Sequence, residues 1–287
     1  MNNNERTVYL NGELVLESQA KISIFDRAVL FGDALYEVAG VTHGKLIDFD
    51  NHMLRYQRNL DSLNIPEPLA PDKIRALFKE LISLNNIVDG LVYMQISRGV
   101  ADRDYVYDEN MQPTVFMFTQ RLTEGEKNAA SEGIKLVSVP DIRWARRDIK
   151  TVNLLGQVLA KQEAHSSGGN EALMIDPEGF VTECGSSSFF IVKENKVLTR
   201  RLNRDILPGV TRKALIRLCE EQKIDLVESR FDLATALDAD EAFITAASIY
   251  LMPVNQIDDQ KIGDSVPGPV TRKLLEIYSA YVEETLT

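Results

Sequence analysis

Apolar and polar residues alternate over several stretches of the first 120 residues, which is the pattern of half-buried strands. Two such runs meet at Asn11-Gly12, a dipeptide suited to a tight hairpin turn. Helical spacing of apolar residues begins near Asp50 and again near Pro71. The other apolar runs of this part predict strands within 34–49, 91–97 and 114–119.

Residues 121–133 are polar and poor in strand-forming residues, so we expect them to link two domains. The preceding residues, 1–120, would form a small N-terminal domain, and residues 134–287 a larger C-terminal one. In the larger part, strands and hairpins alternate with three helical patterns, within 153–169, 209–222 and 269–286. The sum predicts two mixed α+β domains.

Charge and composition narrow the class of partner. The 287 residues carry a formal charge of −11 without a basic tract, so nucleic acid is not an expected partner. No apolar run approaches the length of a membrane span, and the N-terminus lacks the pattern of a signal peptide, so we expect a cytoplasmic protein. Cys184 and Cys219 lack a CxxC spacing and are expected to be reduced.

Neither a metal site nor a serine nucleophile is favoured. The three histidines, His43, His52 and His165, lack the spacing of metal ligands, and we expect them to be solvated surface residues. The GSSS run at 185–188 is not a GxSxG nucleophile motif.

Lys150 is the first candidate for chemistry. It follows the charged stretch DIRWARRD, residues 141–148, and precedes a helical pattern. Neighbouring cations and partial burial are the influences that lower a lysine pKa and leave a nucleophilic amine. A surface cluster of ion pairs would carry the same residues, and local charge alone does not separate the two interpretations.

Two later segments supply what a heteroaromatic phosphate cofactor requires. Glu183 follows the run GFVT, where a carboxylate could keep the ring nitrogen protonated. The stretch ILPGVTRKAL then predicts a turn that leads into a helix, whose first N–H groups, at Val210 and Thr211, favour a phosphate. A lysine, a carboxylate and a helix start in this order point to pyridoxal 5'-phosphate.

At this point the chain resembles the pyridoxal-phosphate transaminases of fold type IV, and among them the D-amino-acid transaminases. The resemblance is carried by five segments: DIRWARRDIKTVNLLGQVLAKQEAH, GFVTECGSSSFFIV, ILPGVTRKAL, DRAVLFGDALYEV and NHMLR. It covers nearly the whole chain. It implies a two-domain fold type IV enzyme with a small N-terminal and a larger C-terminal domain, pyridoxal 5'-phosphate as cofactor, and a homodimer.

The same resemblance assigns roles to residues. Lys150 would bind the cofactor covalently and move the proton during the reaction. Glu183 would hold the ring nitrogen. The other implied contacts with the cofactor phosphate are Arg55, Val210 and Thr211, and Leu207 would pack on the ring. The family has a further threonine contact in a later loop, where this chain has Ala247. The neighbouring Ser248 is the implied replacement.

Substrate recognition is implied at three positions. Tyr36 and Arg103 match a tyrosine and an arginine that bind the substrate α-carboxylate in D-amino-acid transaminases, and Tyr105 stands where the family has a histidine. An arginine fork suits a carboxylate, and a tyrosine hydroxyl can donate one further hydrogen bond. An exposed loop charge is the alternative for Arg103.

The expected reaction moves the amino group of a D-amino acid, of the D-alanine type, to a 2-oxo acid such as 2-oxoglutarate. The alternatives share the fold. They are aminodeoxychorismate lyase, a branched-chain L-amino-acid transaminase, an (R)-amine transaminase, and a non-catalytic relative. The combination of Lys150, Glu183 and Arg55 argues against the non-catalytic relative.

Overall fold

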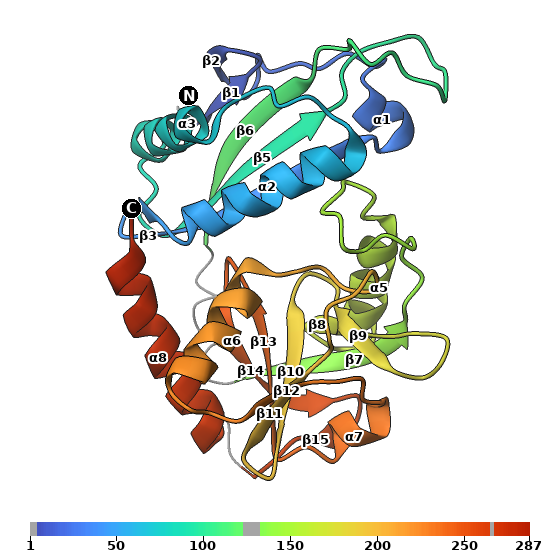
Figure 1. Cartoon of the computed structure of the whole chain (residues 1–287), viewed down its shortest axis with the longest axis vertical. Helices are drawn as coiled ribbons and strands as arrows, with labels where there is room; N and C mark the ends of the chain where they lie inside the picture. Colours follow the sequence, from blue (N-terminus) through green and yellow to red (C-terminus); the bar gives the residue numbers. More distant parts are fainter. Residues whose placement is uncertain (1–4, 123–132, 265–266) are drawn as a thin grey trace. The chain divides into compact units, whose positions relative to one another are not determined.

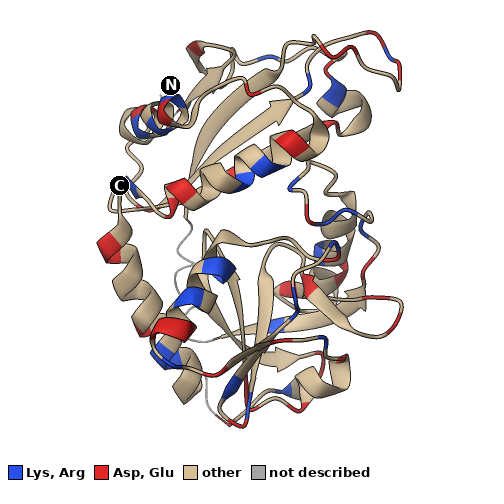
Figure 2. Ribbon diagram, viewed as in Figure 1, with Lys and Arg blue, Asp and Glu red and all other residues tan. Residues whose placement is uncertain are grey.

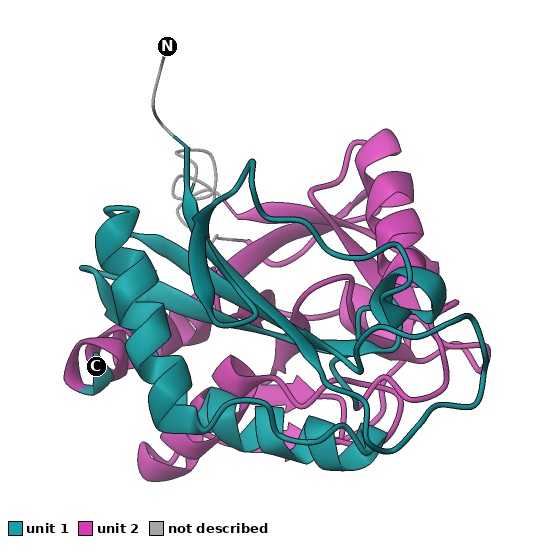
Figure 3. Cartoon of the chain, turned by 90° about the horizontal axis from the view of Figure 1, so that it is seen from above, with its two compact units in different colours: residues 1–122, 149–153, 285–287 teal, residues 123–148, 154–284 magenta. Residues whose placement is uncertain are grey.

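The computed structural model describes residues 5–122, 133–264 and 267–287, and the chain forms two compact units (Figure 3). Unit 1 comprises Met1–Leu122, Ile149–Asn153 and Thr285–Thr287, and unit 2 comprises Thr123–Asp148 and Leu154–Glu284. The predicted linker, 121–133, lies almost entirely outside the described residues. The short segment that carries Lys150 groups with unit 1, whereas the residues on either side of it group with unit 2.

Unit 1 contains an antiparallel sheet with strand order β2-β1-β6-β5-β3-β4 among its described residues (Figure 1). The Asn11-Gly12 turn has positive φ at both residues, 48° and 105°, as the predicted tight hairpin requires. The strands are β1 (Thr7–Leu10), β2 (Glu13–Leu16), β3 (Ala34–Thr42), β4 (Lys45–Leu46), β5 (Gly90–Ser97) and β6 (Thr114–Arg121).

Two amphipathic helices contribute to the core of unit 1. They place apolar side chains such as Met53, Tyr56 and Phe78 in one buried cluster with Leu35 and Met94 of the sheet. The helices of this unit are α1 (Arg27–Phe31), α2 (Phe49–Leu63) and α3 (Pro71–Leu84). The predicted helices at Asp50 and Pro71 are therefore confirmed, with the first beginning one residue earlier.

Unit 2 is built on a mixed sheet with strand order β12-β11-β10-β13-β14-β7-β8-β9, and β15 pairs with β14. The strands are β7 (Ile134–Pro140), β8 (Glu171–Ile175), β9 (Val181–Cys184), β10 (Ser188–Lys193), β11 (Lys196–Thr199), β12 (Leu226–Glu228), β13 (Glu241–Ala246), β14 (Tyr250–Ile257) and β15 (Gln260–Lys261). The helices are α5 (Leu155–Ser166), α6 (Val210–Glu221), α7 (Leu233–Leu237) and α8 (Pro269–Thr285). Both units thus mix helices and sheets, and the α+β prediction is confirmed.

Helix α5 buries its small residues and exposes its large ones. Ala160 and Ala164 are buried, whereas Leu155, Val158 and Leu159 are 70%, 58% and 51% exposed. These three side chains lie at helical spacing on one face, so α5 presents an apolar stripe to the solvent side of unit 2.

Within the described residues, no helix combines the length and the apolar character that a membrane crossing needs. Lysine and arginine are interspersed with aspartate and glutamate along both units (Figure 2).

Helix α8 begins at a buried carboxylate. Glu241 of β13 is 7% exposed, and its two oxygens accept hydrogen bonds from the N–H groups of Val270 and Thr271, at 2.9 and 2.7 Å. Backbone N–H groups in the first turn of a helix have no partner within the helix, and a carboxylate also suits the positive end of its dipole. Glu241 therefore ties α8 to the sheet.

Glu241→Ala should lower the free energy of unfolding by about 1–3 kcal/mol, since it removes the partner of one buried and one half-buried N–H group. Urea denaturation followed by circular dichroism measures this effect. Glu276→Ala is the matched control, because Glu276 is exposed on the same helix. Equal unfolding midpoints for the two variants would contradict the capping role.

Candidate active site

Lys150 is held by backbone pairing with the start of β3. The Tyr36 N–H donates to the Lys150 carbonyl at 3.0 Å, and the Val152 N–H donates to the Ala34 carbonyl at 3.1 Å. The half-buried Lys150 side chain places Nζ 4.0 Å from the centroid of the Tyr36 ring. Two of the predicted site residues, Lys150 and Tyr36, are therefore in direct contact within unit 1.

Asn153, at the end of the segment that carries Lys150, packs closely against Gly32. Gly32 has φ +67°, and a Cβ there would lie 2.5 Å from Oδ1 of Asn153. Asn153 in turn donates from Nδ2 to the Gly32 carbonyl at 3.2 Å. The close approach of Asn153 to Gly32 fixes the chain three residues after Lys150.

Arg55, the predicted phosphate contact, lies on α2 against a buried carboxylate. Nε and Nη2 of Arg55 donate to the two oxygens of Glu37, both at 2.8 Å, and Glu37 is fully buried on β3. His52, one helical turn earlier, contacts the same carboxylate through Nδ1 at 2.9 Å. Our expectation that His52 is a solvated surface residue is wrong, since it is 2% exposed.

These contacts set the charges of the buried cluster Glu37, His52 and Arg55. Burial by itself would raise the pKa of Glu37, but the Arg55 guanidinium and the hydrogen bonds from Arg55 and His52 lower it to about 2. Burial lowers the pKa of His52, and Glu37 opposes that change. Glu37 is thus ionised and His52 neutral at neutral pH, so Nδ1 of His52 carries the proton that it donates to Glu37.

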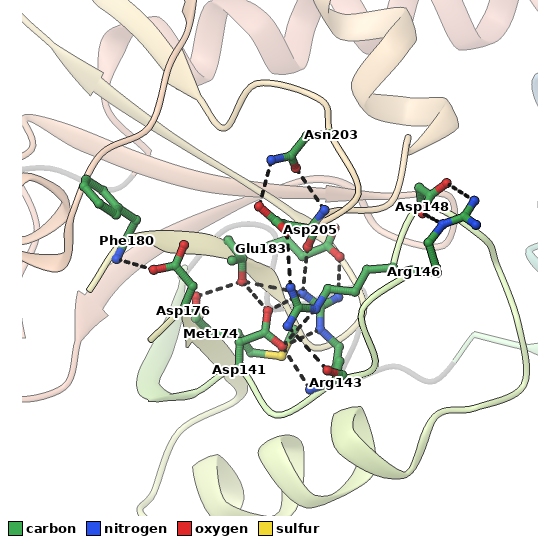
Figure 4. Close-up of polar contacts among 12 residues, drawn as sticks. Asp141, Arg143, Arg146, Asp148, Met174, Asp176, Phe180, Glu183, Asn203 and Asp205 are labelled. Atoms are coloured by element: carbon green, nitrogen blue, oxygen red, sulfur yellow. Dashed lines mark hydrogen bonds and ion pairs between the residues drawn. The ribbon is translucent and has the colours of Figure 1, made fainter. Parts of the chain in front are cut away.

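In unit 2, Glu183 on β9 is held by Arg143 (Figure 4) and by the backbone of Leu207. Nη1 of Arg143 forms a short ion pair with its Oε1, and the Leu207 N–H lies 3.2 Å from each of its oxygens. Burial raises the pKa of the Glu183 carboxyl above its usual range, while the Arg143 charge and the Leu207 N–H oppose the rise. The carboxylate is therefore fixed in place and has an enhanced affinity for a proton.

Arg143 is itself held by a second carboxylate. Its Nε and Nη2 donate to the two oxygens of Asp141, at 2.9 and 2.7 Å, and Thr182 Oγ1 donates to Asp141 at 2.7 Å. Arg146 pairs with Asp148 at 2.9 Å. The arginine-rich stretch before Lys150 thus matches its charges with carboxylates of its own unit, and its clearest task is to position Glu183.

The loop that carries Leu207 is tied to the same stretch. The Arg147 N–H donates to the Arg204 carbonyl at 3.0 Å, and Nη2 of Arg143 lies 3.4 Å from the Asp205 carbonyl. Asp205 is also held through its side chain, by Nδ2 of Asn203 at 2.7 Å (Figure 4). Nη2 of Arg200 donates to the same carboxylate at 2.8 Å. These contacts hold the chain before Leu207, and the predicted site residues Glu183 and Leu207 are brought together.

Helix α6 begins where the sequence predicts it. Gly209 is its N-cap residue, and Val210 and Thr211 begin its first turn. A Cβ on Gly209 would meet Ser188 Oγ at 3.0 Å, and Ser188 is paired across the sheet with Thr245. Thr245 is 3% exposed, and its hydroxyl has no hydrogen-bond partner among the described residues. Ala247 and Ser248 follow as half-buried residues between β13 and β14.

Arg103 and Tyr105 lie in the loop between β5 and β6, residues 98–113, and both are exposed. Nη2 of Arg103 is 3.4 Å from the Tyr105 hydroxyl, and both side chains lie near the ring of Phe31. In the described part of unit 1, no contact joins either of them to Tyr36. One chain therefore brings Arg103 and Tyr105 into contact with each other, but not with Tyr36, the third predicted substrate contact.

Sequence reasoning missed three groups that position the site residues: Glu37, Arg143 and Asp141. The signal for Arg143 was present in the stretch DIRWARRD, but the sequence does not show which carboxylate each arginine pairs with. Glu37 lies in an apolar strand pattern, where a fully buried charge with partners on a distant helix leaves no local trace.

Comparison with known proteins gives the family context. Residues 34–257 match the model of the family described as amino-transferase class IV. The chain is 35% identical over 267 residues to the D-alanine aminotransferase of Bacillus licheniformis, covering 93% of this chain and 94% of that protein. It is 34% identical over 276 residues to the D-alanine aminotransferase of Staphylococcus haemolyticus, covering 96% of this chain and 98% of that protein.

Solved structures share the fold. The branched-chain amino acid aminotransferase of Escherichia coli matches with a TM-score of 0.91 at 22% identity, covering 97% of this chain and 95% of that one. The branched-chain aminotransferase of Thermoproteus uzoniensis, solved with norvaline, matches with a TM-score of 0.86 at 23% identity, covering 99% of each chain. The prediction of a fold type IV architecture is confirmed.

The Glu37–His52–Arg55 cluster should make unit 1 less stable in acid. In the unfolded chain His52 and Glu37 take up protons near their ordinary pKa values of 6.5 and 4.5, whereas both pKa values are lower in the folded state. The unfolded state therefore binds more protons as the pH falls, and the free energy of unfolding decreases below about pH 6.5. Lowering the pKa of Glu37 from 4.5 to about 2 amounts to about 3 kcal/mol, which is lost progressively below about pH 4.5.

Hydrogen exchange of peptides from β3 and α2, corrected for intrinsic rates, measures this loss between pH 7 and pH 4. Peptides from β10 of unit 2 serve as the internal control. Protection of β3 that stays constant relative to β10 over that range would contradict the titration of the cluster.

Proposed function

We propose that this chain, which belongs to the class IV aminotransferase family, transfers the amino group of a D-amino acid, D-alanine in particular, to a 2-oxo acid such as 2-oxoglutarate. The observation that carries the proposal is the similarity to D-alanine aminotransferases over 93–96% of the chain, which spans every candidate site residue. The branched-chain enzymes are less than 25% identical and support the fold alone.

The residues present fit pyridoxal 5'-phosphate. Glu183 offers a fixed, buried carboxylate of raised proton affinity, which suits a protonated ring nitrogen. The first turn of α6 offers backbone N–H groups, and the buried Thr245 hydroxyl on the neighbouring sheet lacks a partner among the described residues. This donor set suits a phosphate. Lys150 supplies a half-buried primary amine.

When bound, pyridoxal phosphate supplies an electron-withdrawing ring that stabilises negative charge at the substrate Cα. We assign Lys150 to hold the cofactor covalently and to take the proton from the substrate Cα through Nζ. Its backbone pairing with β3 and its contact with the Tyr36 ring restrict where this amine can move. Arg143 keeps Glu183 oriented, and the Leu207 N–H holds the same carboxylate. The Leu207 side chain would pack on the cofactor ring.

We assign phosphate binding to Arg55, to the N–H groups of Val210 and Thr211, and to Ser248. Glu37 fixes the Arg55 guanidinium through two hydrogen bonds, so this cation keeps one orientation. Ala247 lacks the hydroxyl that the family provides, and we expect this loss to weaken cofactor binding by on the order of 1 kcal/mol.

Substrate recognition points to a homodimer. Arg103 and Tyr105 are exposed and make no contact with Tyr36 in the described part of the chain, which fits a site in which a second copy supplies the loop. The exposed apolar stripe of Leu155, Val158 and Leu159 is a surface that a second copy could cover. Two buried free cysteines are consistent with a cytoplasmic enzyme.

The first test is a half-reaction with a panel of amino donors. Purified enzyme loaded with pyridoxal phosphate should lose its visible cofactor absorption rapidly with D-alanine and release pyruvate. Lys150→Ala should show neither the absorption of the covalently bound cofactor nor turnover, a loss of at least about 10³-fold because the variant lacks both the covalent link and the base.

The other donors decide between the alternatives. Bleaching only by L-leucine or by (R)-1-phenylethylamine would replace D-alanine with a branched-chain or an amine substrate. Formation of 4-aminobenzoate from aminodeoxychorismate would identify a lyase instead. Lys150→Arg keeps the charge without a usable amine and is the matched control for Lys150→Ala.

The shared pocket is tested by mixing two defective chains. Lys150→Ala and Arg103→Ala chains, co-expressed with different affinity tags, give a hybrid dimer in which one site has an intact lysine from one chain and an intact arginine from the other. At subsaturating D-alanine the purified hybrid should recover about half of wild-type turnover, since one of its two sites is complete. A hybrid as inactive as the two parent dimers would place Lys150 and Arg103 of the same chain in one site.

A further inference from the structure

We propose that Arg27, Asp33 and Arg98 form an anchor that fixes the 98–113 loop and thereby positions Arg103 and Tyr105 for the substrate carboxylate. The inference rests on the proposed function for the role of the loop. The anchor itself is visible in the contacts of unit 1.

Asp33 is shared by two buried arginines. Nε and Nη2 of Arg98 donate to its two oxygens at 2.8 and 3.1 Å, and Nε of Arg27 donates to Oδ2 at 2.8 Å. Each arginine is 4% exposed. The two arginine charges lower the pKa of Asp33 against the effect of burial, so it remains a carboxylate. One carboxylate therefore orients two guanidinium groups, which have further donors for other partners.

The remaining donors of Arg27 reach into the loop. Nη1 donates to the Asp104 carbonyl at 2.6 Å, and Nη2 lies 3.4 Å from the Tyr105 carbonyl. These two carbonyls directly follow Arg103 and belong to the backbone from which the Tyr105 side chain extends. The backbone at the tip is thus held by Arg27, while the side chains of Arg103 and Tyr105 are left exposed for another group.

Arg98 fixes the descending side of the loop and connects it to α2. Its guanidinium carbon lies 3.6 Å from the centroid of the Tyr107 ring, a close cation–π contact. Nη1 and Nη2 also donate to the carbonyls of Asn64 and Leu63, at 2.9 and 2.7 Å, where α2 ends. The loop is therefore attached to the packed part of unit 1 through side chains as well as through its two ends.

The base of the loop is closed by backbone contacts. The Arg27 N–H donates to the Gly99 carbonyl at 2.9 Å. Gly99 has φ +119°, and a Cβ there would lie 2.1 Å from the Gln112 carbonyl, so no other residue fits. A narrow base and a tip held by Arg27 leave the loop little freedom, which reduces the entropy lost when Arg103 binds a carboxylate.

Phe31 completes the arrangement at the tip. Its ring lies 5.6 Å from the guanidinium carbon of Arg103, 5.4 Å from the Tyr105 ring and 4.6 Å from the guanidinium carbon of Arg27. The aromatic ring thus contacts both exposed side chains and the arginine that holds their backbone. Arg27, Asp33 and Arg98 are positioning residues, since they act through the loop and not on the substrate.

The test combines proteolysis with kinetics on the full-length enzyme loaded with pyridoxal phosphate. Arg27→Gln removes both contacts to the loop carbonyls but leaves the Arg98–Asp33 pair, and Tyr107→Ala removes the ring beneath Arg98 without changing a buried charge. Both variants should be cut by trypsin after Arg103 at least about tenfold faster than the wild type, because the loop opens more often. Both should also raise KM for D-alanine by roughly tenfold with little change in kcat, because ordering the loop then costs binding free energy.

Two controls match these variants. Tyr107→Phe keeps the ring and should behave as the wild type in both assays. Arg121→Gln also removes an arginine bond to a backbone carbonyl, that of Asn85, but at the other end of the β5–β6 pair, and it should leave the cleavage after Arg103 unchanged.

The two readouts separate the anchor from the function. Wild-type cleavage rates in Arg27→Gln and Tyr107→Ala would overturn the anchor whatever the enzyme's substrate. Faster cleavage with an unchanged KM for D-alanine would show that the anchored loop does not position the carboxylate contacts. If the wild type itself fails to react with D-alanine, the proposed function is wrong, and the cleavage rates still decide whether the anchor exists.

Discussion

A buried carboxylate needs a partner for its charge, and this requirement organises both units of the protein. Glu37 in unit 1 is matched by Arg55 and His52, and Glu183 in unit 2 is matched by Arg143. An unpaired carboxylate at such positions would cost several kcal/mol or would take up a proton. In each unit, therefore, an arginine from another segment must stay beside the carboxylate of a strand. These strands, β3 and β9, also carry Tyr36 and Glu183, which are assigned to the site.

Most of the helices and strands could be predicted from the sequence, because turn residues and the spacing of apolar residues indicate them locally. Asn11-Gly12 specifies a hairpin through its positive φ angles, and the helices at Asp50 and Pro71 follow from helical spacing of apolar residues. Strand β14 was not predicted, since it contains Pro253, which argues locally against a strand. Its first residue, Tyr250, also adopts a positive φ that the sequence does not indicate. Sheet pairing with β13 and β7 outweighs the effect of Pro253.

The candidate site was predictable only in part. The order of Lys150, Glu183 and the α6 start indicated the cofactor class, and the family match agrees with it; the individual roles stay predictions. What could not be inferred was pairing at a distance, such as Arg143 with Glu183 or His52 with Glu37. Each of these partners is 15 to 40 positions away in the sequence, and helical or strand periodicity carries no information over that range.

The grouping of residues 149–153 with unit 1 has a consequence for how the protein can be divided or evolve. The chain passes between the units four times. The short segment 149–153, which contains Lys150, supplies backbone hydrogen-bond partners for the start of β3. No single cut in the sequence yields two self-sufficient pieces, since a fragment ending before residue 149 loses the backbone partner of Ala34 and Tyr36. Recombination that exchanged only residues 1–122 between relatives would pair Lys150 of one protein with strand β3 of another. Lys150 and its backbone support therefore depend on each other although 114 positions separate Lys150 from Tyr36.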